Sequence, residues 1–540
     1  MIKNKIECKS DCRGWEVEEV VDQIFKDRNI KDPEHFLNPT VEDMLPLTDL
    51  KNIEEAADIV IENVRAGNRI GIYGDVDVDG LTSTTIIYRY LKRLDPNADI
   101  QIFLNHGKSH GLQMYNLDEC KKCDILIVVD SLDSTAFLYE EVQTNSEVTD
   151  VIVLDHHSIN PKVPYDKWIT LVSSQRDYGN PELSGAGVCM KFVLYLDEQL
   201  GLNYADDLYD LCASGLCADM MDMRVPENRY LMSKGLEEIH NPAVSKLAGG
   251  FGWDSKSIAF SIAPAVNASM RMDKNEYALK AFLADDNKEI LENVKVLKKC
   301  KDEQNREIDD MMPAVIKQCQ EQLSKKMIVV FIDTESGISG LLANRLLDKY
   351  KRPIVVLKDD DDCYKGSMRG YGVEDFQAMI NESKLGRSFG HPLAASCEVK
   401  KRDFQKFVDY MEEHLHDVGS FEETIEADIA ANVEDIDRAY VRKIQELNKI
   451  SGTGFKAVRV YLSGITDYEI GNMSKGKHLV IKPVNSELTI IQWNFDGDWD
   501  RFYDAAMMGD ELECVVELQQ GLIGKTFMLQ GIVSWLNIKG

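Results

Sequence analysis

Carboxylates at alternate positions are the feature of this sequence with the clearest chemical meaning. Asp75, Asp77 and Asp79 follow a short apolar run and precede a segment expected to be helical. A strand that delivers several carboxylates to one loop builds the oxygen-rich environment that Mg²⁺ and Mn²⁺ prefer. An EF-hand loop begins in the same way, but its twelfth position, which requires Glu, is Ile86 here. A solvated acidic turn without a metal is the remaining alternative.

Two further apolar runs end in side chains of the same kind. The run DILIVVD ends in Asp130, and the run VIVLDHH ends in Asp155, His156 and His157. Alternation of strands with helices predicts a parallel sheet, and such sheets bind ligands at the carboxyl ends of their strands. We therefore expect the three strand ends to converge on one edge of a sheet.

Taken in order, these motifs resemble those of the DHH phosphoesterase superfamily and, within it, the RecJ single-stranded-DNA exonucleases. The run GDVDVDG resembles the first family motif, VVDS the second, and LDHH the motif that names the superfamily. LCADMMDM resembles a later motif and puts Asp219 at a fourth ligand position, while SGAGV matches a glycine-rich turn of the family. Each motif is short, but their order and spacing together are specific.

The resemblance and the distribution of apolar runs predict an α/β protein of several domains. A parallel-sheet DHH catalytic domain and a second α/β domain, the DHH-associated domain, are expected to be joined by a long helix and followed by a C-terminal OB-like β-barrel. A chain of 540 residues is long enough for roughly three or four domains. The expected segments are a helical lead-in (1–55), the DHH catalytic domain (56–235), a helical connector (236–325), the DHH-associated substrate-binding domain (326–425), a helical linker (426–454) and the OB-like domain (455–540).

The resemblance also implies a chemistry, namely hydrolysis of a phosphodiester with two divalent ions, Mn²⁺ or Mg²⁺. Asp130 or a first-motif aspartate would bridge the ions. His157 would contact the scissile phosphate or protonate the leaving group, and Asp155 would orient the histidines. The implied metal ligands are Asp75, Asp77, Asp79, Asp130, His156 and Asp219.

Substrate-binding residues are implied in two places. Lys108 stands in a loop where the family has an arginine, and a lysine holds a terminal phosphate less rigidly. In the expected DHH-associated domain, Ser367 and Arg369 lie in KGSMRG, and Gly390 and His391 lie in RSFGHPLAAS; both stretches resemble family motifs. Arg369 would hold a phosphate through its guanidinium, the alternative being a surface salt bridge.

The amino-acid composition and the net charge limit which partners the protein is expected to bind. A net charge of −30, with 62 Lys and Arg against 92 Asp and Glu, argues against non-specific coating of nucleic acid but permits a local basic groove. Twelve scattered cysteines and the lack of any apolar leader or membrane-length run predict a cytoplasmic chain with reduced thiols and no membrane partner. A zinc site involving the CxxC at 120–123 is a weaker alternative. We expect a monomer that acts on single-stranded DNA, with a helicase or a single-strand-binding protein as a further partner.

The function predicted from these features is metal-dependent 5′-to-3′ exonuclease activity on single-stranded DNA, in recombination, repair or replication. One alternative is a small-nucleotide phosphodiesterase acting on oligoribonucleotides or cyclic dinucleotides, which a barrel deletion would leave active. The other is a replication-associated DNA-binding module with vestigial chemistry, against which the complete acidic set argues. Departures from the family motifs indicate a divergent member, and a phage origin is left open.

Overall fold

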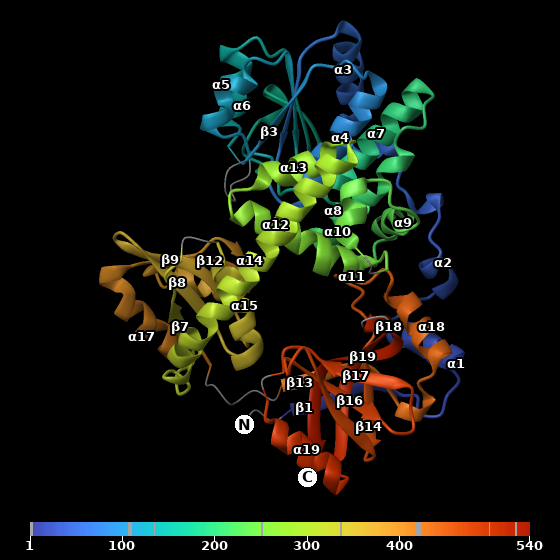
Figure 1. Ribbon diagram of the computed structural model, residues 1–540. Coiled ribbons are helices and arrows are strands. Elements are labelled where there is room, and N and C mark those ends of the chain that lie inside the picture. The colour runs from blue at the N-terminus through green and yellow to red at the C-terminus, as the bar shows by residue number, and fades with distance from the viewer. Residues whose placement is uncertain are drawn as a thin grey trace. The chain divides into compact units, whose positions relative to one another are not determined.

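The computed structural model describes residues 4–105, 111–133, 135–249, 252–334, 337–416, 423–495, 497–523 and 526–539 (Figure 1). The chain divides into two compact units, which are described one at a time. The first comprises Met1–Lys5, Arg271–Lys274 and Val296–Thr424, and the second comprises Ile6–Met270, Asn275–Lys295 and Ile425–Gly540. Among the described residues, none of the helices is both long and apolar enough to cross a membrane.

The second unit contains a five-stranded, all-parallel sheet in the order β3-β2-β4-β5-β6. Both faces of the sheet are covered, so its strands are near-continuous apolar runs, as expected of buried parallel strands. One face packs on α5 and α6 through a core that includes Leu117, Tyr139 and Val142, and helices α4 and α7 contact strands β2 and β5. The strands are β2 (Ile70–Gly74), β3 (Ile100–Leu104), β4 (Ile125–Val129), β5 (Asp150–Asp155) and β6 (Thr170–Ser173).

Helices before, between and after these strands complete the parallel-sheet domain. They are α3 (Ile53–Ala66), α4 (Val78–Leu94), α5 (Met114–Cys120), α6 (Phe137–Asn145), α7 (Gly185–Leu200), α8 (Tyr209–Ala218), α9 (Pro226–Gly235), α10 (Pro242–Ala248), α11 (Ser255–Ser257), α12 (Ala263–Arg271) and α13 (Asn275–Leu283). The long helix α14 (Asn287–Gln320) follows and matches the expected connecting helix.

The same unit also contains an eight-stranded sheet in the order β1-β13-β14-β18-β19-β17-β16-β15. This β-rich region is consistent with the expected OB-like domain, and a long antiparallel hairpin of β18 and β19 lies at its centre. Its strands are β1 (Asn4–Asp11), β13 (Glu423–Ala431), β14 (Val460–Ile465), β15 (Tyr468–Met473), β16 (His478–Pro483), β17 (Leu488–Gln492), β18 (Glu511–Ile523) and β19 (Thr526–Lys539), and the helices are α1 (Val17–Asp27), α2 (Pro33–Leu37), α18 (Arg438–Asn448) and α19 (Trp499–Met508).

Two segments differ locally from the expectation. Residues 4–11, expected in a helical lead-in, form an edge strand of the eight-stranded sheet, and residues 423–431, partly expected in a helical linker, form its neighbour. Sequence periodicity does not reveal which distant strand a short segment will pair with, because the partner lies more than 400 residues away.

The first unit contains a six-stranded mixed sheet in the order β10-β12-β9-β8-β7, with β11 paired to β12. One face packs on α16 and α17 through residues such as Phe376 and Phe407, and the other packs on α14 and α15 through residues such as Val315 and Leu342. The elements are β7 (Ile328–Phe331), α15 (Ser339–Tyr350), β8 (Ile354–Asp360), β9 (Cys363–Arg369), α16 (Phe376–Glu382), β10 (Gly386–Arg387), β11 (Gly390–His391), β12 (Ala394–Lys400) and α17 (Phe404–His414).

Candidate metal centre

The register of the parallel sheet brings three predicted site residues to one edge. Gly74 of β2 pairs with Val129 of β4, and Val129 pairs with Leu154 of β5. The next residue on each strand is an aspartate, namely Asp75, Asp130 and Asp155. All three are at most 3% exposed. The expected convergence of strand ends is therefore a direct result of sheet register.

The start of helix α4 supplies two more carboxylates. Asp77 caps the helix, since one of its oxygens accepts a hydrogen bond from the Gly80 amide at 3.0 Å. Asp79 lies in the first turn and is buried. Gly80 is required by close packing, because a Cβ atom there would lie 2.6 Å from the Asp75 carbonyl oxygen. The GDVDVDG run thus folds back on itself so that its aspartates share one pocket.

Asp79 is held by the start of a second helix, α7. Its carboxylate accepts hydrogen bonds from the backbone amides of Gly185 at 2.7 Å and Ala186 at 3.0 Å. Amides at a helix N-terminus stabilise negative charge, so the start of α7 holds the Asp79 carboxylate in place. Gly185 also allows close approach, since a Cβ atom there would lie 2.6 Å from Asp130 Oδ1. The glycine-rich turn is therefore a support for the acidic cluster.

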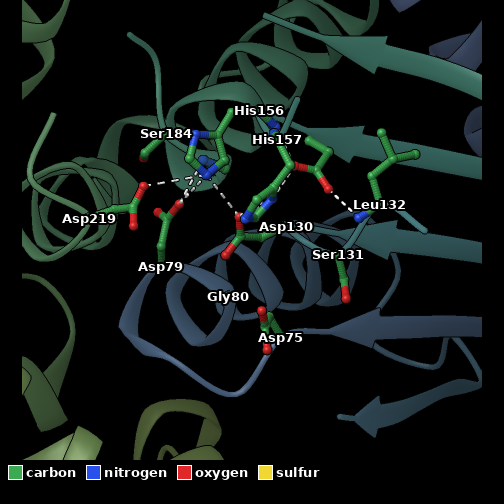
Figure 2. Close-up of polar contacts among 12 residues, drawn as sticks. Asp75, Asp79, Gly80, Asp130, Ser131, Leu132, His156, His157, Ser184 and Asp219 are labelled. Atoms are coloured by element: carbon green, nitrogen blue, oxygen red, sulfur yellow. Dashed lines mark hydrogen bonds and ion pairs between the residues drawn. The ribbon is translucent and has the colours of Figure 1, made fainter. Parts of the chain in front are cut away.

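The imidazole of His156 is the point at which the carboxylates meet. Its Nε2 atom lies 3.2 Å from Asp130 Oδ1, 3.4 Å from Asp219 Oδ2 and 3.7 Å from Asp79 Oδ2. Figure 2 shows the three carboxylates pointing toward this ring from separate elements. One nitrogen with three carboxylates around it is a donor set typical of a divalent transition-metal or Mg²⁺ site.

Ligand atoms close enough to share one ion form three overlapping groups among the described residues. Two of them adjoin, one with Asp79, His156 and Asp219 and another with Asp75, Asp77 and Asp130. The third contains Asp130, Asp155, His156 and His157. Asp130 connects the two groups through its contact with His156. It also has a positive φ of 51°, and its buried Oδ1 atom receives no hydrogen bond from the described residues. A strained residue with an unsatisfied buried oxygen between two ligand groups fits a carboxylate that bridges two cations.

The electrostatics of the cluster support the same interpretation. Burial, with the nearby charge of Asp79, raises the pKa of Asp130 well above its ordinary value. The same two causes raise the pKa of Asp219 to about 8. Like charges crowded in a buried site disfavour ionisation unless cations neutralise them. The residues present therefore fit a pair of divalent cations, although their role as ligands stays a prediction.

His157 and Asp155 form a separate ion pair beside the cluster. His157 Nδ1 lies 2.8 Å from Asp155 Oδ1, and Asp155 also accepts hydrogen bonds from the backbone amides of Leu132, His156 and His157. Burial favours the neutral forms of both residues, but their mutual attraction raises the pKa of His157 to about 9 and holds that of Asp155 below its usual range. Asp155 therefore holds His157 in place and favours its protonated form, and the orienting role of this aspartate stays a prediction.

One buried residue at this edge was not anticipated. Asn105 follows β3, next to β2 in the sheet, and its side-chain amide donates a hydrogen bond to Ser131 Oγ at 2.8 Å. Its Oδ1 atom is buried and accepts no hydrogen bond within the part of the chain that the structure describes. A polar residue directly after the short apolar run IQIFL was the available signal. Lys108, three residues further on, lies outside the described residues.

The remaining predicted residues lie together on the six-stranded sheet of the first unit. In the register of β9 and β12, Arg369 pairs with Ala394 and Ser367 pairs with Ser396. His391 of β11 pairs with the same Ala394, so it lies in one row with Arg369. Gly390 has a φ of 134°, which only glycine adopts readily. The sheet thus brings the two RecJ-like stretches together.

Arg369 is bound by neutral oxygen atoms. Its guanidinium donates to the side-chain oxygen of Asn344 and to the Met368 carbonyl, and burial lowers its pKa. Ser367 Oγ lies 2.8 Å from the hydroxyl of Ser339 at the start of α15. A Cβ atom on Gly340 would lie 3.0 Å from Arg369 Nη2. A guanidinium, two hydroxyls and a helix N-terminus at one place are suited to an anion.

Comparison with known families agrees with this arrangement. Residues 69–216 match the DHH family, N-terminal domain, and residues 324–417 match the DHHA1 domain. These ranges contain all the predicted site residues apart from Asp219, which lies three residues beyond the first match. The chain is a divergent, RecJ-like member of the DHH family.

Individual relatives extend the similarity along the chain. It is 27% identical over 517 residues to the putative SPbeta prophage-derived single-strand DNA-specific exonuclease YorK of Bacillus subtilis (strain 168), covering 88% of each chain. It is 31% identical over 376 residues to the single-stranded-DNA-specific exonuclease RecJ of Thermus thermophilus, covering 67% of this chain and 54% of that one. The crystal structure of RecJ in complex with Mn²⁺ from Thermus thermophilus superposes with a TM-score of 0.76 at 25% identity, covering 96% of this chain and 75% of that one.

Proposed function

We propose that this protein is a metal-dependent exonuclease that hydrolyses the phosphodiester bonds of single-stranded DNA from the 5′ end. The observation that carries the proposal is the pair of adjoining acidic groups joined by Asp130. Relatives named as single-strand DNA-specific exonucleases, including one solved with Mn²⁺, support the substrate class and the cofactor. The 5′-to-3′ direction rests on the family resemblance.

Each predicted residue has a role in this proposal. Two divalent ions, Mn²⁺ or Mg²⁺, would activate water and stabilise charge on the phosphate when bound. Asp155 holds His157 through Nδ1, and His157 would bind the scissile phosphate or donate a proton to the leaving oxygen. Arg369, Ser367, Gly390 and His391 form the anion site that would bind a phosphate of the strand. The ions would be held by Asp75, Asp77, Asp79, Asp130, His156 and Asp219.

The proposal also covers the cellular compartment, the partners and the oligomeric state of the enzyme. The twelve cysteines are all free in the structure, which supports a reducing compartment such as the cytoplasm. The acidic chain favours delivery of the strand by a partner, for which we propose a helicase or a single-strand-binding protein, acting with a monomeric enzyme. Stimulation of digestion when a purified single-strand-binding protein is added tests this part.

A single-stranded DNA labelled separately at each end tests the activity and its direction. With Mn²⁺, we expect mononucleotides to be released progressively from the 5′ end. Asp130→Asn should lower the rate by more than about a hundredfold, because loss of mere partners of metal ligands already costs 10–100-fold. Asp150→Asn is the matched control, since Asp150 lies at the opposite end of strand β5 and should leave the rate unchanged.

Other outcomes would redirect the assignment. Cleavage of dinucleotides without digestion of the long strand would place the protein among small-nucleotide phosphodiesterases. Release of nucleotides from the 3′ end would keep the metal chemistry and overturn the direction. Binding of the strand without hydrolysis in any divalent ion would overturn the proposed enzyme and leave a binding module.

A further inference from the structure

Asp219 differs from the other predicted ligands in how it is held. Asp75, Asp130 and His156 follow strands of the parallel sheet, and Asp79 lies in a buried helix turn. Asp219 instead ends helix α8, and Met220 after it has a positive φ of 58°. The Asp219 side chain is 34% exposed, against 1% for Asp79 and 2% for Asp130. The position of Asp219 therefore depends on whatever holds the turn 219–225.

A loop from the C-terminal part of the chain packs directly on this turn. The Met223 amide donates a hydrogen bond to the Thr453 carbonyl at 2.9 Å. Gly454, with a φ of 76°, lies so close that a Cβ atom on it would be 1.8 Å from Asp222 Oδ1 and 2.8 Å from Arg224 Nε. Asp222 and Arg224 are themselves joined by an ion pair of 2.6 Å. The loop and the turn are thus joined by a backbone hydrogen bond and by close packing of Gly454 against two side chains of the turn.

The loop 451–455 is itself firmly anchored. Its Phe455 ring is 1% exposed and lies 4.9 Å from the ring of Phe36, and the guanidinium of Arg28 lies 4.4 Å above Phe455. At the other end, the Ser451 amide donates to Ser255 Oγ at 3.1 Å. The Gly452 amide bonds the Phe455 carbonyl at 2.9 Å and closes the loop. A loop fixed at both ends can hold the turn that it touches.

A buried arginine connects the same two segments a second time. Arg229 of α9 donates to the carbonyl oxygens of Met223 and Ile450, both at 3.4 Å. Its guanidinium also lies 3.5 Å from the centre of the Phe36 ring. The turn after Asp219 is thereby tied to the C-terminal loop by both backbone and side-chain contacts.

We propose that the loop 451–455 is a positioning element for the metal ligand Asp219, so that the C-terminal domain sets the affinity of the centre for one of its two ions. The inference rests on the metal centre of the proposed function. Residues that hold metal ligands from outside commonly account for a 10–100-fold change in metal affinity. The loop acts through Asp222–Arg224 and touches neither substrate nor ion.

Gly454→Ala in the full-length protein tests this role. The added methyl group would displace Asp222 and Arg224 and, with them, the turn that carries Asp219. We expect Mn²⁺ titration, followed by calorimetry or by the electron paramagnetic resonance signal of free Mn²⁺, to show one of two ions bound about tenfold more weakly. Exonuclease activity should need correspondingly more Mn²⁺ and recover at saturation, with KM for DNA unchanged.

Gly464→Ala is the matched control. Gly464 lies in the same C-terminal domain with an almost identical φ of 74°, but a Cβ atom on it would meet no described atom within 4 Å. It therefore introduces the same backbone strain without contact to the turn. Its Mn²⁺ affinity should equal that of the wild type.

A second variant distinguishes displacement of the turn from general misfolding as the cause of weaker Mn²⁺ binding. Adding Asp222→Ala to Gly454→Ala removes the carboxylate with which the methyl group collides, so Mn²⁺ binding should recover at least partly. Wild-type affinity for both ions in Gly454→Ala, or equal weakening in Gly464→Ala, would overturn the positioning role. Failure of the wild type to bind Mn²⁺ would instead overturn the metal centre itself.

Discussion

The metal centre proposed for the DHH domain and the anion site proposed for the DHHA1 domain have opposite arrangements of charge. In the metal centre, carboxylates are buried together, and within the described residues the ion pairs of Asp79, Asp130 and Asp219 are with histidines. In the anion site, the guanidinium of Arg369 is held by neutral oxygens of Asn344 and Met368.

This difference shows how each site is prepared for its ligand. Concentrated negative charge that the neighbouring histidines do not fully offset raises the pKa values of Asp130 and Asp219 and is relieved by divalent ions. A guanidinium without a carboxylate partner keeps its charge available for a phosphate. Loss of charge should therefore affect chemistry in the first site and substrate affinity in the second.

After Asp130→Asn, the largest expected effect is that of Asp155→Asn, which keeps the shape of the side chain and removes the charge next to His157. Burial then acts without its nearest opposing carboxylate, so the pKa of His157 should fall from about 9 toward its ordinary value, although Asp219 and Asp75 still act to raise it. Proton NMR titration of the metal-free protein measures this shift. At pH 7.5, kcat should fall by roughly 10–100-fold.

Asp166→Asn is the control for that variant. Asp166 belongs to the same domain and pairs with Arg176, but its side chain is 60% exposed, and exposed ion pairs contribute little. An unchanged His157 titration in Asp155→Asn would contradict the role assigned to Asp155.

Arg369→Ala should have a smaller effect of another kind. Removing the guanidinium should raise KM for single-stranded DNA by about tenfold, as expected for loss of a charge-assisted phosphate contact, and leave kcat within about threefold. Steady-state kinetics with and without a 5′-phosphate separate the two parameters. Arg345→Ala, which breaks the exposed ion pair with Asp309 in the same domain, is the control. A fall in kcat without a rise in KM would contradict the expectation that Arg369 contributes to substrate affinity and not to the chemical step.

The smallest expected effect is on thermal stability. Asp219 is protonated up to about pH 8 in the metal-free native state but only up to about pH 4 when unfolded, so the native state binds more protons between these values and loses stability as pH rises. His157, with a pKa of about 9, contributes stability that is complete below about pH 6.5 and is lost as pH rises toward 9. Both groups act in the same direction.

Mn²⁺ should prevent this loss of stability at high pH, because the bound ions neutralise the carboxylates in place of the protons. We expect Mn²⁺ to raise the melting temperature by on the order of a few degrees more at pH 8 than at pH 5.5, measured by differential scanning fluorimetry. In Asp219→Asn, the pH dependence of the metal-free protein should be reduced. Equal stabilisation by Mn²⁺ at both pH values would argue against carboxylates that ionise only with metal.

Much of the catalytic region follows from local sequence. An apolar run ending in Asp130 predicts both a buried strand and a polar residue at its carboxyl end, and a parallel register then places Asp75, Asp130 and Asp155 side by side. Asn105 likewise comes directly after a strand, β3, but its neutral side chain did not identify it as a site residue in the sequence.

Other features depend on contacts between distant segments. The amides of Gly185 and Ala186 that hold Asp79 lie more than 100 residues from it. The N-terminal strand β1 joins a sheet whose other strands begin at residue 423. The clash that Gly454 avoids with Asp222 has no trace in the sequence around either residue.

The sequence alone determined which residue types lie at the ends of the strands, because alternation and apolar runs are local and the residue after an apolar run comes at the end of the strand whatever surrounds it. Only the tertiary structure decided which groups support them. Sheet pairing, helix-terminal amides and the loop that holds Asp219 depend on the close approach of backbones far apart in the chain, and no local pattern encodes that approach.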